Sequence, residues 1–103
     1  MAAVYSTNLY SGHDVTSWTS SPVPAGDVVI VRDIDVWFGG GVIGGPWSVF
    51  GIAGQTFAWG TFDSLIPALH SWRGRQVIPP GQTFGFTALP GLDVTVSGYV
   101  LTA

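Results

Sequence analysis

The sequence contains no lysine and no glutamate, and charged residues make up only 9% of the chain. An ordinary soluble domain has about 25%. Its three cationic side chains are arginines, they form no cluster, and the net charge is −3. Because binding to nucleic-acid phosphates requires several well-placed cations, this composition argues against a nucleic-acid partner.

Cysteine, long apolar runs and a targeting segment are lacking as well. With zero cysteines, disulfide bonds and thiolate chemistry are excluded. No apolar run reaches the roughly 18 residues that a spanning helix needs, so we expect no membrane span. The first residues, MAAVYS, show no basic region followed by an apolar core, and we expect no signal peptide.

Apolar and turn-forming residues dominate what is present. Apolar residues reach 47%, with fifteen glycines and seven prolines. Serine, threonine, glycine and six aspartates are the polar cover that remains for a chain of 103 residues. We therefore expect other chains to cover much of the apolar surface, as in a homo-oligomer or another assembly.

The hydrophobic pattern is β throughout. Period-2 runs rich in Val, Ile, Thr and aromatic residues alternate with Pro and Gly turn signals, and no segment keeps helical spacing over three turns. Two stretches, VPAGDVVIV (Val23–Val31) and IPPGQTFGF (Ile78–Phe86), share a Pro-x-Gly turn before a strand. These features predict one all-β domain over residues 1–103, a jelly-roll-like sandwich of seven to eight short antiparallel strands.

Particular strands follow from the same pattern. We expect them at Ala3–Tyr10, Val28–Phe38, Trp47–Ile52, Gln55–Phe62, Trp72–Ile78, Thr83–Ala88 and Asp93–Leu101. One short helical turn is expected near Phe62–Leu69, where Pro67 limits its length.

The run VVIVRDIDVWF (Val28–Phe38) is the strongest strand. Its even positions form one apolar face interrupted by Arg32, and this face is predicted to lie in the core: Val28, Ile30, Ile34, Val36 and Phe38. Its odd positions change from Val29 and Val31 to Asp33, Asp35 and Trp37. That second face is expected to meet a neighbouring chain at one end and solvent at the other.

No residue pattern favours catalysis or metal binding. His13 and His70 are far apart in loop-like stretches, whereas a zinc site needs three or four converging ligands. Asp33 and Asp35 are neighbours on one strand face, whereas the two carboxylates of a glycosidase lie across a cleft. There is no G-x-S-x-G nucleophile motif. We expect no catalytic residue, metal or cofactor; a small hydrolase would require a cleft that brings a histidine beside Ser and Asp side chains.

Five tryptophans leave two functions open. They are Trp18, Trp37, Trp47, Trp59 and Trp72. Tryptophans fill cores and subunit interfaces, where they contribute much of the binding energy, and we favour this interpretation. Exposed rings also stack on sugars, and a solvent-facing row of them would favour a carbohydrate-binding module.

Arg73 and Arg75 stand on either side of one glycine. Residues one apart on a strand point to the same face. Arginine pairs with carboxylates through a planar fork and is weakly hydrated. These two arginines are therefore predicted to fix the alignment of contacts within a subunit or between subunits. The candidate interface residues are therefore Arg73, Arg75, Trp37, Asp33, Asp35 and Trp72.

Three segments, VIVRDIDVWF, SWRGRQVIPPGQTF and DVTVSGYVLTA, resemble small β-rich virion proteins encoded among the structural genes of tailed phages of actinobacteria. The resemblance covers Pro22–Phe38 and Ser71–Ala103. It implies a non-enzymatic minor tail or capsid decoration protein, assembled in the host cytoplasm, whose partners are other copies of itself and other virion proteins. The alternative is a carbohydrate-binding β-sandwich that uses exposed Trp side chains to attach to a host-surface glycan.

Overall fold

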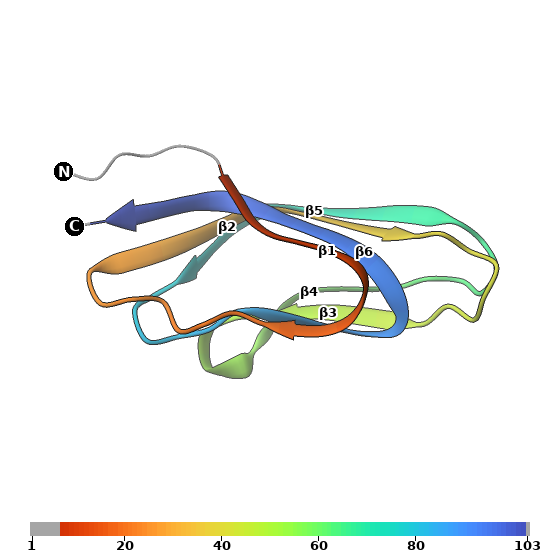
Figure 1. The fold of residues 1–103 in the computed structure, drawn as a ribbon, viewed down its shortest axis with the longest axis horizontal. Coiled ribbons are helices and arrows are strands. Elements are labelled where there is room, and N and C mark those ends of the chain that lie inside the picture. Colours follow the sequence, from red (N-terminus) through yellow and green to blue (C-terminus); the bar gives the residue numbers. More distant parts are fainter. Residues whose placement is uncertain (1–6, 103) are drawn as a thin grey trace.

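The computed structural model describes residues 7–102, which form an all-β fold of antiparallel strands (Figure 1). The six strands are β1 (Thr7–Thr19), β2 (Asp27–Phe38), β3 (Pro46–Phe50), β4 (Thr56–Thr61), β5 (Ala68–Ile78) and β6 (Gly85–Thr102). One 3-10 turn, η1 (Ile52–Gly54), separates β3 from β4. Within the described residues, no helix has the length and apolar character needed to cross a membrane.

The strands form one sheet that bends into two layers. Its order is β4-β3-β6-β2-β5, with β1 paired to the other side of β6. The first part of β6 pairs with β3, and its second part, from Asp93 to Thr102, pairs with β2. Strand β1 accompanies β6 through both parts, from Thr19 opposite Gly85 to Thr7 opposite Gly98. In Figure 1 these two strands curve together from one layer to the other.

The predicted sandwich is confirmed, but the described part of the chain has six strands rather than seven or eight. The segments Thr83–Ala88 and Asp93–Leu101 belong to the single bent strand β6. Of the expected strand Ala3–Tyr10, residues 3–6 lie outside the described range, and β1 continues to Thr19.

The expected helical turn near Phe62–Leu69 is wrong. Leu65 has a positive φ of 71° within a turn, and β5 already begins at Ala68. The backbone of this segment bonds to the glycine-rich loop after β2: Leu65 N donates to Val42 O at 2.9 Å, and Gly41 N donates to Leu65 O at 3.3 Å. These loop-to-loop bonds replace the bonds that a helical turn would have made.

Strand β2 has a buried centre, as predicted, although its faces are not continuous. Ile30, Ile34 and Val36 are all buried. The pairing register shifts between Val31 and Asp33 on both sides of β2, which places a bulge at Arg32. Before the bulge Val29 and Val31 belong to the core cluster, and Ile30 is buried outside it. The prediction of a single even-numbered face is therefore wrong, because the bulge reverses the alternation.

The core lies between the two layers. Each of β2 to β6 contributes buried apolar side chains to it, and β1 covers one side with partly buried Leu9, Tyr10, Val15 and Trp18. Strands β4 and β5 occupy the two ends of the strand order and have no pairing with each other in the described structure. A side-chain bond crosses this opening: Trp47 Nε1 donates to His70 Nδ1 at 2.9 Å.

Candidate functional site

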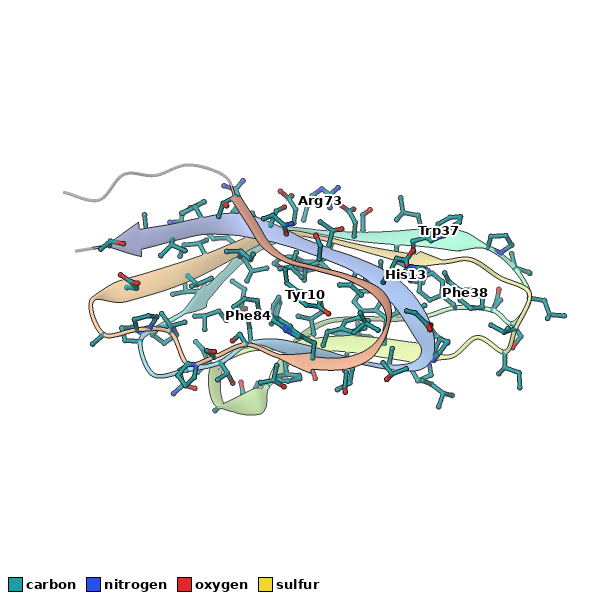
Figure 2. All side chains as sticks on the ribbon, in the orientation of Figure 1. Tyr10, His13, Trp37, Phe38, Arg73 and Phe84 are labelled. Carbon is teal, nitrogen blue, oxygen red and sulfur yellow. The ribbon has the colours of Figure 1, made fainter. Side chains whose placement is uncertain are left out.

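Four of the predicted site residues lie on the outer surface of the layer formed by β2, β5 and the second half of β6: Asp33, Asp35, Trp37 and Arg73. Trp72 instead packs against the core. Arg73 on β5 contacts two carboxylates of β2: its Nε is 3.2 Å from Asp33 Oδ1, and its Nη2 is 3.0 Å from Asp35 Oδ1. The carboxylates of its own chain are therefore partners of Arg73, as predicted. Figure 2 shows Arg73 on this outer surface.

Solvent reaches this ion-pair group. The side chains of Arg73, Asp33 and Asp35 are 56%, 40% and 39% exposed. Ser71 Oγ donates to Asp35 Oδ1 at 2.7 Å. This bond, together with the Arg73 guanidinium, lowers the pKa of Asp35, and partial burial opposes the effect. Exposed ion pairs of this kind contribute about 0–1 kcal/mol to the free energy of folding. They therefore matter more for the alignment of β5 with β2 than for the stability of the fold.

The other arginines behave differently from Arg73. Arg75 is exposed, and within residues 7–102 it has no ion pair. Arg32, expected on an apolar face, is exposed at the bulge, where its Nε donates to Gly74 O at 3.1 Å. Because β5 is also irregular between Arg73 and Gln76, the simple alternation that placed Arg73 and Arg75 on one face is interrupted.

Both histidines lie in strands, which corrects their expected loop location. His70 is in β5, where it accepts the Trp47 bond and stacks on Phe62 with ring centroids 3.9 Å apart. His13 is in β1, and its Nδ1 is 2.6 Å from Asp93 Oδ1. In the part of the chain that the structure describes, no group of three His, Cys, Asp or Glu side chains could hold a metal ion.

The tryptophans do not form a row. Trp47 is 4% exposed, Trp18 stacks on Tyr10, and Trp72 packs edge-on against Phe57. These three belong to the interior or its margin. Trp59, at 74%, and Trp37, at 43%, are the exposed ones, and they lie on strands of different layers. The flat platform of several rings that would favour sugar binding is therefore not formed by the described residues.

Trp59 belongs to a groove that sequence reasoning did not find. The groove has a volume of about 430 Å³, and its lining residues are Pro46, Trp47, Ser48, Trp59, Gly60, Thr61, Thr87, Ala88 and Leu89. None of them is charged. Trp59 points outward because the positions on either side of it point inward: Ala58 is buried, and a Cβ on Gly60 would meet the Trp47 indole at 2.7 Å.

A second apolar surface covers the end of the molecule opposite the end of β6 (Figure 1). It is formed by the loops after β2 and β4 together with the start of β5. Its exposed side chains are Val42, Ile43, Leu65, Ile66 and Leu69. We call it the apolar end. Gly44 N donates to Ser64 Oγ at 3.0 Å, and this bond and the backbone bonds between the loops join the two loops.

Trp37 borders a smaller pocket of about 270 Å³ beside the apolar end. The polar residues that line the pocket are His13, Asp14 and Asp93, and Gly39 and Gly40 line it as well. The sequence signal for this pocket was weak, because its residues come from three strands that are far apart in the chain.

No protein-family model matches the chain, and no curated protein matches its sequence.

Proposed function

We propose that this protein is a non-enzymatic structural subunit that acts through contacts between copies of itself. The observation that carries the proposal is the uncharged groove around Trp59, where a ring that is 74% exposed stands beside Leu89, which is 69% exposed. Tryptophan is the side chain most enriched among residues that dominate protein interfaces. Single exposed apolar residues are ordinary, but a groove built from them indicates a binding surface.

A second copy fits this groove better than a charged partner does. The groove lining contains no charge, whereas Asp33, Asp35, Asp93 and Arg73 all lie on the other layer. Two copies that approach groove to groove therefore bring no like charges together. The same patch then meets itself across a two-fold axis, which is the commonest symmetry of homo-oligomers.

The experiment that tests this proposal is sedimentation velocity of the purified chain across micromolar concentrations. We expect a concentration-dependent dimer or larger species. Trp59→Ser should shift the equilibrium toward monomer by about tenfold or more, the usual scale for an interface tryptophan.

Trp37→Ser is the matched control, because it removes the other exposed tryptophan from the opposite layer. It should leave self-association unchanged. A wild-type chain that stays monomeric over the whole concentration range contradicts the proposal, and so does equal weakening by both variants.

The particle to which the subunit belongs is proposed from the resemblance. We propose a tailed-phage virion, with this chain as a minor tail or capsid decoration protein. The rigid all-β fold and the exposed groove suit a subunit that is repeated in a shell or tube. Mass spectrometry of purified particles should detect the chain in fixed ratio to the major structural proteins. Its loss on purification, with infectivity retained, contradicts this assignment.

A further inference from the structure

The pocket beside Trp37 places three different side chains on three neighbouring strands. Trp37 on β2 is the register partner of Asp93 on β6, and Asp93 contacts His13 on β1. An indole, a carboxylate and an imidazole therefore lie in sequence across the sheet. Figure 2 shows Trp37 and His13 close to the bend where β1 and β6 pass between the layers.

The carboxylate at the centre is held in place. Asp93 Oδ1 is 2.6 Å from His13 Nδ1 and accepts a bond from the backbone N of Asp14 at 3.1 Å. Asp14 has a positive φ of 54°, and its carboxylate occupies the space that a Cβ on Gly91 would need. A side chain at residue 91 would displace the irregular part of β1, between Gly12 and Val15, that supplies this backbone donor.

Three polar atoms remain available to a ligand. Asp93 Oδ2, His13 Nε2 and Trp37 Nε1 have no hydrogen-bond partner among residues 7–102. The Asp93 side chain is 43% exposed and the His13 side chain 88% exposed, so a ligand can reach both. The contact with Asp93 fixes His13 Nδ1 as the protonated nitrogen, which leaves Nε2 to accept a bond in the neutral ring.

We propose that this pocket binds one pyranose residue of a glycan. A sugar ring presents an apolar C–H face, which stacks on an exposed indole, and adjacent hydroxyls, which both donate and accept hydrogen bonds. The hydroxyls donate to Asp93 Oδ2 and His13 Nε2. A small pocket with an aromatic wall and a few convergent polar groups is the usual form of such a site.

A cationic ligand fits less well than a sugar. Trp37 would attract a cation through its ring face. However, a quaternary cation has no hydrogen to donate to Asp93 Oδ2 or His13 Nε2, whereas sugar hydroxyls do, and Asp14 is directed toward Gly91. The volume of about 270 Å³ matches a single ring rather than an extended chain.

The test is a titration of ¹⁵N-labelled protein with the methyl glycosides of glucose, galactose, mannose and N-acetylglucosamine, followed through the tryptophan indole N–H signals. The Trp37 signal, identified by its absence in Trp37→Phe, should move with saturation at millimolar concentration for at least one glycoside. The Trp59 signal is the internal control and should stay in place.

Variants separate the roles of the pocket residues. Trp37→Ala should abolish the effect, as read from backbone amide signals of the pocket, and Trp37→Phe should retain part of it through stacking. Asp93→Asn should weaken binding by about tenfold or more, because it replaces a charged acceptor by a neutral one. Trp59→Ala should bind like wild type.

Several results would overturn the proposal: no movement of the Trp37 signal with any of the four glycosides, movement of Trp59 instead, or unchanged affinity in Trp37→Ala. Movement with tetramethylammonium but no sugar would assign the pocket to a cation. Because the groove variants and the pocket variants lie on different layers, failure here leaves the self-association result intact, and the reverse also holds.

Discussion

The outer surfaces of the two layers carry different chemistry on the same backbone plan. The layer of β2, β5 and the second half of β6 presents Arg73 in contact with Asp33 and Asp35, and it presents Asp93 in contact with His13 of β1. The layer of β3, β4 and the first half of β6 presents an uncharged groove around Trp59. Strand β6 contributes to both surfaces. The contrast shows that the two outer surfaces differ in charge, because β3, β4 and the first half of β6 contain no charged residue.

The largest expected effect comes from the core that both layers share. Ile34 has no exposed surface. Ile34→Asp buries a carboxylate without a partner, which costs more than a domain of this size can tolerate. We expect loss of the β signal in far-UV circular dichroism. Thr56→Asp, an exposed position on β4, is the control and should fold normally. A variant that melts like wild type would show that the face of Ile34 is wrongly assigned.

The next largest loss of stability is expected at the opening between β4 and β5, which the Trp47–His70 bond crosses. His70→Ala removes the acceptor of the Trp47 indole, which lies in the interior, and the ring stacked on Phe62. Leaving a buried donor unpaired costs about 1–3 kcal/mol, and the lost stacking adds about 0.5–1.5 kcal/mol. Urea unfolding should show a loss of about 2–4 kcal/mol.

The matched control for His70→Ala is His13→Ala, which removes an exposed histidine from β1. It should change stability by less than about 1 kcal/mol. Equal losses for the two variants would mean that the Trp47–His70 bond does not hold the layers together.

A charge introduced into the uncharged groove tests which of the two layers makes the contact between copies. Thr87 and Thr95 are exposed threonines on β6, the first in the groove and the second opposite Asp35 on the charged side. Thr87→Asp should weaken self-association by about tenfold or more, because the new carboxylates face each other across the contact. Thr95→Asp should leave association unchanged. Sedimentation velocity of both variants distinguishes them, and the opposite order of effects would place the contact on the charged layer.

The smallest effect concerns the Arg73 group. Because the pKa of Asp35 is lowered below 3.8 in the folded state, its contribution is complete above that pH and is lost as the pH falls through the folded value. In Arg73→Ala and Ser71→Ala, stability at neutral pH should fall by about 0–1 kcal/mol. The difference from wild type should shrink as urea unfolding is repeated toward about pH 2. A difference that stays constant with pH would show that the lost stability does not come from the carboxylates.

Local patterns predicted the centre of β2 correctly. The alternation of apolar and polar residues around Ile34 and Val36 correctly predicted that both are buried. The glycine and proline turn signals between the strands correctly predicted the sandwich. The reversal at Arg32 was not predictable, because a bulge depends on the register of β5 and β6, which are distant in sequence. The bend in β6 was taken for a gap between strands. Pro90 stands in that bend, where residues 89–91 have no strand partner, so the missing N–H interrupts no pairing.

The candidate sites were harder to predict than the fold. Pairing of Arg73 with carboxylates followed from the side-chain chemistry, since few other partners exist for it in this sequence. The outward direction of Trp59 did not follow, because alternation alone does not tell which face of a short strand is inside. Which face of β4 points inward is decided by the position of the Trp47 side chain against Gly60. The contact between His13 and Asp93 likewise requires the β1–β6 register, which no short motif encodes.

The central place of β6 also determines when this chain can fold on the ribosome. β6 is synthesised after every other strand, yet it is the neighbour of β1, β2 and β3. Until it emerges, β1 has no partner among the described strands, and the β3–β4 hairpin and the long-range β2–β5 pair are two separate pieces with apolar faces open to water. Two-stranded units of this size are marginal alone, and pairing between distant segments is slow. Neither layer can therefore be completed during synthesis until β6 has emerged, because β6 is the strand that joins them.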